Sequence, residues 1–400
     1  MTATAAPEPA VSVPRAAVGA VVLAALALWA WSLYGGDSSS RALSFSLVAG
    51  AAFGIVLQRG RFCFLCNFRD FVEKRDPRGL LSILVALAVG FVLYQVVFLA
   101  WVPVPQPDRL PPTAHVGPAS PVLALAAFVF GLGMAVSRSC ISAHLYRLGE
   151  GSPTAPFALV GAAIGFVLGF LTWNGLYLSV ISEWPAVWLP HTIGYTGTAI
   201  VTLALLGALA LLVLAFARPQ PADTPSTPTL RSVLCGVFVK RWPAALTGVA
   251  VGVIAMAAYF RVAPLGVTAE LGSLARTAAD GFGVLPETLY GLDGLRGCAT
   301  AVKQAVFSNN GVFVIGLVAG SFAAALVSGQ FKPEAPNGGH VVRGLVGGVL
   351  MGWGAMIGLG CTVGVLLSGI HAGALAGWVF LVFCTLGVWL GLVGMKRIGQ

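Results

Sequence analysis

The chain has 400 residues, of which 58% are hydrophobic and only 9% are charged. Soluble domains carry roughly 25% charged residues, so this composition excludes an ordinary soluble protein and is typical of a polytopic helical membrane protein. The net charge of +9 does not indicate nucleic-acid binding, because the basic residues lie mainly at the ends of apolar segments and so report membrane orientation. We therefore expect an all-α protein whose surroundings are a lipid bilayer.

Apolar segments that predict membrane-crossing helices follow one another along the chain. They cover residues 16–34, 43–57, 79–101, 119–136, 155–181, 192–217, 243–259, 311–328, 341–359 and 372–395. Residues 1–15 are expected to be disordered. The segment 16–34 has a spanning length and no small-residue cleavage site after it, so it is predicted to be a retained helix rather than a signal peptide.

The loops between these segments differ in charge. Residues 58–78 hold six lysines and arginines, and the loop 218–241 and the C-terminal end are also basic. The loop 102–118 is rich in proline and holds one arginine. Because basic loops stay in the cytoplasm, this pattern predicts about ten crossings with both termini on the cytoplasmic side.

Two cysteine-centred segments are near copies of each other. The first, GLGMAVSRSCISAHL, covers 131–145, and the second, GWGAMIGLGCTVGVL, covers 352–366. Two glycines and the cysteine, Cys140 or Cys361, keep one offset of 221 residues. The predicted crossings place the two copies in opposite directions, which is typical of an inverted-topology repeat.

The repeat predicts how the chain is divided. An extra N-terminal helix region covers 16–42, the first half 43–217, a cytoplasmic linker 218–240 and the second half 241–400. The segment 43–57 rises only about 22 Å, less than the hydrocarbon core of about 30 Å.

Each cysteine copy is followed by an apolar stretch that is too short to cross the membrane. These stretches cover 141–149 and 361–370. We expect both to be re-entrant half-helices that meet at the bilayer midplane, where such breaks mark a substrate site.

The first break contains Arg138, Ser139 and Cys140. Serine is a good N-cap, so Ser139 is predicted to cap the following half-helix and to place Cys140 in its first turn. The free backbone N–H groups of such a helix start attract anions. Arg138 is predicted either to bind the anion or to anchor the inner face of the protein.

The second break contains Gly360, Cys361 and Thr362. Glycine permits a tight turn and a close approach of ligand, and Thr362 adds a hydroxyl group. A thiol is a weak donor and a soft acceptor, which suits a ligand with its own terminal sulfur better than it suits sulfate. Small-residue packing at a helix crossing is the alternative explanation for two symmetric cysteines.

A third cysteine segment, GRFCFLCNF, holds Cys63 and Cys66 in a C-x-x-C spacing. This spacing is typical of redox or metal chemistry, but no second cysteine pair lies nearby and the histidines are dispersed, so we predict no metal site. Gln58 and Arg61 are candidate substrate contacts at the cytoplasmic mouth, and the alternative for Arg61 is a positive-inside anchor. On the outer side, Arg296 and Cys298 belong either to an anion-gathering cluster or to a plain amphipathic helix.

These motifs together resemble the YeeE/YedE family of sulfur-compound permeases. The resemblance lies in LQRGRFCF followed by FRD, in SC-x-S followed by GEGS, and in GLGC-x-x-G, and it covers residues 43–395. It implies an hourglass-shaped helical fold, thiosulfate uptake across the bacterial inner membrane, and a central path lined by Cys63, Cys140 and Cys361. It also implies a small TusA-like cytoplasmic sulfurtransferase as partner. We predict no cofactor.

The sequence therefore predicts an inner-membrane permease for thiosulfate or a related sulfur-bearing anion, and not an enzyme. A permease for a selenium compound remains open. So does a membrane thiol-disulfide oxidoreductase that uses Cys63 and Cys66 as its redox pair. A structural docking platform for a sulfurtransferase is a third possibility.

Overall fold

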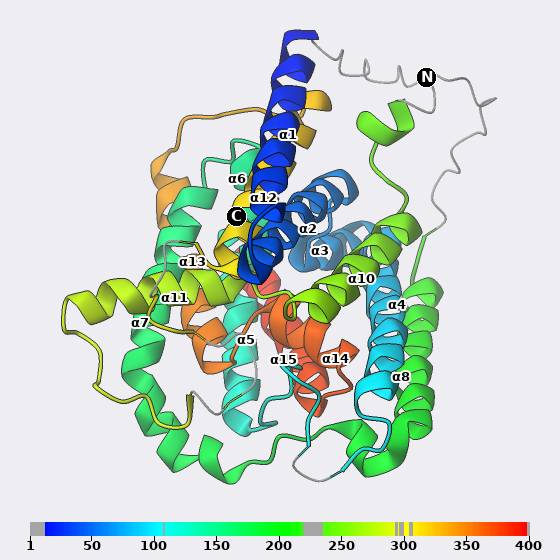
Figure 1. The fold of residues 1–400 in the computed structure, drawn as a ribbon, viewed down its shortest axis with the longest axis vertical. Coiled ribbons are helices and arrows are strands. Elements are labelled where there is room, and N and C mark those ends of the chain that lie inside the picture. The colour runs from blue at the N-terminus through cyan, green and yellow to red at the C-terminus, as the bar shows by residue number, and fades with distance from the viewer. Residues whose placement is uncertain are drawn as a thin grey trace.

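The computed structural model describes residues 13–106, 109–218, 235–292, 295, 300–303 and 307–397. This part of the chain is helical apart from its connections, and its strand-like pairing is limited to isolated β-bridges such as that between Trp188 and Ala374. Ten of its helices are long and apolar enough to cross a membrane, so the predicted all-α polytopic membrane protein is confirmed (Figure 1).

The helices follow the predicted segments closely. Their bounds are α1 Val13–Tyr34, α2 Ser38–Gly60, α3 Phe64–Lys74, α4 Arg78–Trp101, α5 Pro121–Ser137, α6 Ile141–Gly149, α7 Ala155–Ser179, η1 Ile181–Glu183, α8 Leu189–Ala215, α10 Ala244–Arg261, α11 Val267–Gly281, α12 Asn309–Val327, α13 Gly338–Ile357, η3 Thr362–Ser368, α14 Gly369–His371 and α15 Leu375–Arg397.

Helix α2 is longer than predicted. It has 23 residues, which corresponds to about 34 Å. Its start is fixed by Asp37, whose carboxylate accepts a hydrogen bond from the Ser40 backbone N–H, and its end by Arg61 in the left-handed conformation. The expectation that residues 43–57 are too short to span is therefore wrong, because polar residues at both ends continue the helix.

The ends of the chain and the linker are described only in part. Residues 1–12 of the predicted disordered N-terminus lie outside the described residues, and Val13 to Arg15 already belong to α1. Residues 219–234 of the predicted linker also lie outside them. At the start of that linker, the Arg218 backbone N–H donates to the Arg75 carbonyl at 3.1 Å.

The spanning helices pack in pairs that correspond between the two halves. Helix α2 packs on α12, and its counterpart α10 packs on α4. Helix α7 packs on α13, and its counterpart α15 packs on α5. Glycines make these contacts close: a Cβ atom at Gly54 would lie 2.1 Å from the Leu317 carbonyl oxygen, and one at Gly352 would lie 2.0 Å from that of Ala162. Small residues that let backbones approach are the usual means of helix association in membranes.

The crossing of α5 and α13 relates the two cysteine copies to each other. Gly133 faces the Gly347 carbonyl, and Gly354 faces the Ala126 carbonyl. Adding the 221-residue offset to Gly133 gives Gly354, and subtracting it from Gly347 gives Ala126. The offset therefore converts the first contact into the second. We propose on this basis that the halves are related by an inverted repeat.

The predicted division of the chain stays a prediction, and the helix contacts offer an alternative to it. Helix α1 packs on α12, and α8 packs correspondingly on α4. The contacts therefore favour α1–α7 as the first unit and α8–α15 as the second, with α1 as a regular member rather than an extra helix.

Short helices interrupt both halves. The predicted half-helix 141–149 is α6, and the predicted 361–370 corresponds to Thr362–His371, which begins as a π-helix. Helices α3 and α11, of 11 and 15 residues, were not anticipated as half-helices. At about 1.5 Å per residue none of the four reaches across a hydrocarbon core of about 30 Å.

Candidate transport site

The N-termini of α3 and α6 bring two thiols together. Cys63 is the N-cap residue of α3, and Cys140 is the N-cap residue of α6. Their Sγ atoms lie 3.9 Å apart, and each residue is only 1% exposed. The structure thus joins two of the three cysteines that the sequence predicted to share a path, although 77 residues separate them in the chain.

Each thiol of this region has a polar neighbour. Cys140 Sγ lies 3.2 Å from the Ser142 hydroxyl, and Cys66 Sγ accepts a hydrogen bond from Arg147 Nη2 at 3.1 Å. Ser142 and Arg147 both belong to α6, so one half-helix supplies partners to two cysteines. None of the six cysteines in the described part of the chain is in a disulfide.

The helix start at the first break differs from the prediction. Cys140 itself, not Ser139, is the N-cap residue of α6, in an extended conformation and without a side-chain cap. The reason is local: Arg138 ends α5 in the left-handed conformation, and the Ser137 hydroxyl donates to the Ser139 carbonyl at 3.0 Å. Ser139 is fully buried, and its hydroxyl has no hydrogen-bond partner among the described residues.

Arg138 lies on the surface, whereas its neighbours Ser139 and Cys140 are buried. Its backbone N–H caps α5 by donating to the Met134 carbonyl. This placement favours the interpretation of Arg138 as an anchor of the inner face over the interpretation as a substrate contact.

The second break presents a third buried thiol. Cys361 is 1% exposed and is the N-cap residue of the π-helix η3. Before it, Leu359 and Gly360 have positive φ angles of 57° and 150°, so the turn needs the conformational freedom that glycine provides at 360. The Thr268 side chain of α11 lies against the Cys361 thiol, and Thr362 is also buried.

A basic pocket lies beside α3 and the C-terminal end of α6. It has a volume of about 580 Å³ and reaches Cys66 and Arg147. Its cationic side chains outnumber its acidic ones by five to three, so it attracts anions. The cations are Arg61, Arg69, Arg147, Arg241 and Lys332, and the acids are Asp70, Glu150 and Glu334.

An amide and carboxyl network borders this pocket. Gln58 Nε2 donates to Glu150 Oε1 at 3.2 Å and to Gln330 Oε1 at 2.8 Å. The predicted contact Gln58 is 1% exposed and is not among the residues that line the pocket, whereas the predicted contact Arg61 does line it. Burial raises the pKa of Glu150, because a carboxylate is less favourable away from water.

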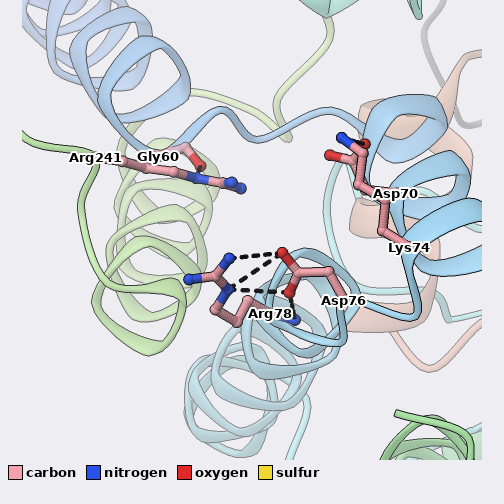
Figure 2. Close-up of polar contacts among 6 residues, drawn as sticks. All are labelled: Gly60, Asp70, Lys74, Asp76, Arg78 and Arg241. Atoms are coloured by element: carbon pink, nitrogen blue, oxygen red, sulfur yellow. Dashed lines mark hydrogen bonds and ion pairs between the residues drawn. The ribbon is translucent and has the colours of Figure 1, made fainter. Parts of the chain in front are cut away.

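The rim near the pocket is held by further polar contacts (Figure 2). Arg78 donates to the Asp76 carboxylate, with Nη2 at 2.8 Å from Oδ2, and this hydrogen bonding lowers the pKa of Asp76. Arg241 Nε donates to the Gly60 carbonyl at 3.3 Å, which fastens the segment before α10 to the end of α2. The loops of the two halves are thereby joined at one face of the protein.

The predicted outer-side cluster is described only in part. Arg296 and Cys298 fall outside the described residues. In the neighbouring region Glu270 of α11 is buried and binds Lys303 Nζ and the Ser308 hydroxyl, the latter at 2.6 Å. Lys303 is thus neutralised by Glu270 rather than free to gather anions. Within the described part of the chain, no group of three or more histidine, cysteine or acidic residues is arranged for a metal ion.

Sequence reasoning missed Ser142 and Arg147, which contact Cys140 and Cys66, and the buried His144 of the same helix. All three follow Cys140 on α6, and His144 and Arg147 fall one and two helical turns after it. Spacing along the predicted half-helix was a signal that could have placed them beside the cysteine.

In the described part of the chain, ten helices long enough to span a membrane, short helices that bear buried thiols, and a basic pocket lined in part by Cys66 together define a membrane transport protein. The chain belongs to the family described as "Sulphur transport", whose model matches residues 59–390. This confirms the resemblance seen in the sequence.

Curated relatives agree with this assignment. The thiosulfate transporter TsuA of Escherichia coli K12 is 29% identical over 363 residues, which are 86% of this chain and 92% of that protein. TsuA of Spirochaeta thermophila is 29% identical over 360 residues, 86% of this chain and 96% of that protein. A probable transporter, YedE of Escherichia coli K12, is 23% identical over 177 residues, 44% of this chain and 41% of that protein. The relatives are named as transporters, so the chain is a transporter rather than an enzyme.

Proposed function

We propose that this protein imports thiosulfate, or a closely related sulfur-bearing anion, along a path lined by Cys63, Cys140 and Cys361. The observation that carries the proposal is the pair of buried sulfurs, 3.9 Å apart at two helix N-termini. The names of the two TsuA relatives support thiosulfate as the substrate.

The chemistry of the thiols fits such a substrate. Thiosulfate carries a soft terminal sulfur, to which a thiol offers weak S–H donation and a polarisable surface. Helix N-termini add partial positive charge that favours an anion. Weak contacts at several sites let an ion enter and leave quickly, so the thiols pass the terminal sulfur along without a lasting covalent bond.

The direction of the path follows from the charges. In this proposal the anion passes Cys361 first, then Cys140 and Cys63, and leaves through the basic pocket. The pocket face is the cytoplasmic one, because it carries Arg61, Arg69 and Arg241. The protein then lies in the bacterial inner membrane with both termini in the cytoplasm. A TusA-like sulfurtransferase is the proposed acceptor at the pocket.

Uptake of radiolabelled thiosulfate tests this function. The chain is expressed in a thiosulfate-dependent bacterial host that lacks its own permeases, and uptake and growth are measured. Uptake that unlabelled thiosulfate suppresses supports the proposal. A well-expressed protein that gives no uptake contradicts it, and the same assay with selenium compounds then tests the alternative substrate class.

Oxidation is expected to stop transport reversibly. Cys63 caps α3 and Cys66 lies one turn later in it, so oxidation can join Cys63 to Cys66 or to Cys140 and remove a path thiol. We expect diamide to reduce uptake by at least about tenfold, a change of about 1.4 kcal/mol, and dithiothreitol to restore it. If diamide leaves uptake into vesicles unchanged, Cys63 is not a free thiol on the transport path. The matched control is Cys235→Ala.

Glu150 is expected to make transport depend on pH. As the pH rises through its raised pKa, the carboxylate forms and opposes an anion in the pocket. We therefore expect the KM for thiosulfate to rise with pH, and Glu150→Gln to lower it about two- to fivefold at the higher pH and to flatten the profile. Glu287→Gln, at an exposed carboxyl outside the pocket lining, is the control. Equal pH profiles of wild type and Glu150→Gln would disprove this role.

A further inference from the structure

His144 is a buried side chain without a partner beside the thiol pair. It is 2% exposed, and neither ring nitrogen has a hydrogen-bond partner among the described residues. A neutral imidazole offers one N–H donor and one acceptor nitrogen. Leaving such groups buried and unsatisfied costs about 1–3 kcal/mol each, so no hydrogen bond within the described part of the chain accounts for this histidine.

The position of His144 relates it to Cys140 and Cys63. It follows Cys140 by one helical turn, and its backbone N–H donates to the Cys140 carbonyl at 2.8 Å. Side chains four residues apart lie on the same face of a helix, with Cβ atoms about 5–6 Å apart. The imidazole also lies within electrostatic range of the Cys63 sulfur and of the Arg147 guanidinium.

The imidazole N–H of His144 is the kind of hydrogen-bond donor that the oxyanion end of thiosulfate requires. Thiosulfate has a soft sulfur at one end and oxyanion acceptors at the other. Cys63 and Cys140 suit the first end, but a thiol is a weak donor to oxygen. An imidazole N–H is a stronger donor, and a donor already stripped of water needs no further desolvation when the anion arrives.

We infer that His144 binds the oxyanion end of the transported anion while the Cys63–Cys140 pair holds its terminal sulfur. This inference rests on the proposed function and adds to it a specificity-determining residue. The subsite orients the substrate within the constriction. The bound anion accepts a hydrogen bond from the imidazole N–H, which has no partner among the described residues of the free protein. The free-energy cost of the unsatisfied ring is therefore offset only while substrate is bound.

Replacement of His144 separates this role from a structural one. We expect His144→Leu to raise the KM for thiosulfate about 10- to 100-fold, the effect of losing one hydrogen bond to a charged group. The same variant is expected to keep or increase its melting temperature, because it removes unsatisfied buried atoms. His144→Asn and His144→Gln retain an N–H donor, and at least one of them is expected to recover part of the affinity. His191→Ala, at an exposed histidine of α8, is the control.

Two measurements are made on purified protein. Uptake into proteoliposomes gives KM, and protection of Cys140 from N-ethylmaleimide by thiosulfate gives binding without transport. A wild-type KM in His144→Leu would overturn the inference, and so would a raised KM accompanied by a lower melting temperature with no recovery in the amide variants. If wild type binds thiosulfate with a requirement for His144 but does not transport it, the inference stands and the proposed permease function fails. If wild type takes up thiosulfate but thiosulfate gives no protection of Cys140, the inference fails and the permease function stands; if wild type shows neither protection nor uptake, both fail.

Discussion

Replacing Cys140 by alanine is expected to abolish thiosulfate uptake while leaving the protein in the membrane. The substitution removes the sulfur that lies 3.9 Å from Cys63 and 3.2 Å from the Ser142 hydroxyl. On a single path through the protein, every transported anion passes this thiol. We expect at least a tenfold loss of uptake, about 1.4 kcal/mol or more. Uptake at matched membrane expression measures this.

The control for this experiment is Cys235→Ala, because Cys235 lies in the connection between α8 and α10, half-buried and far in the chain from both breaks. Cys140→Ser is informative beside it, since serine keeps a donor of similar size but loses the soft sulfur. Equal loss in the serine and alanine variants supports a role for sulfur itself. Normal uptake by Cys140→Ala would show that this thiol does not lie on the path.

The largest effect on folding is expected from Gly352. A Cβ atom there would lie 2.0 Å from the carbonyl oxygen of Ala162, in the rigid backbone of α7. Even Gly352→Ala therefore requires α7 and α13 to separate, and we expect a cost of about 3 kcal/mol or more. The yield of monodisperse protein and its melting temperature in detergent measure the loss.

Gly175→Ala is the matched control, because it introduces the same methyl group on α7 where no atom lies within 4 Å. It is expected to be neutral or slightly stabilising, since alanine favours helix more than glycine does. Under the proposed repeat, Gly131→Ala should behave as Gly352→Ala does, since its Cβ atom would lie 2.3 Å from the Cys384 carbonyl oxygen. A stable Gly352→Ala protein would contradict the close packing of α7 and α13.

The fold was largely predictable from the sequence, because apolar length alone identifies spanning helices. The repeated glycines were equally informative: Gly133 and Gly354, found as a motif, lie at the mutual crossing of α5 and α13. The end of α2 was predicted poorly. Hydropathy drops at Gln58 and Arg59, yet both are buried inside the protein and continue the helix.

The site was predictable in its sulfurs but not in its partners. Cysteines stand out in apolar sequence, whereas the pairing of Cys63 with Cys140 depends on how α3 and α6 approach each other. That approach is a tertiary contact which no local pattern encodes. Glu150 was missed because an acidic residue near a loop is usually a surface residue until the pocket that it lines is known.

Uptake by purified protein in proteoliposomes tests the central claim most directly. Radiolabelled thiosulfate is supplied outside, and wild type is compared with Cys63→Ala, Cys140→Ala, Cys361→Ala and the Cys235→Ala control, with labelled sulfate as the second substrate. We predict uptake of thiosulfate but not of sulfate by wild type and the control, and a loss of at least about tenfold in each of the three path variants. Thiosulfate uptake that persists in all three would contradict a path lined by thiols.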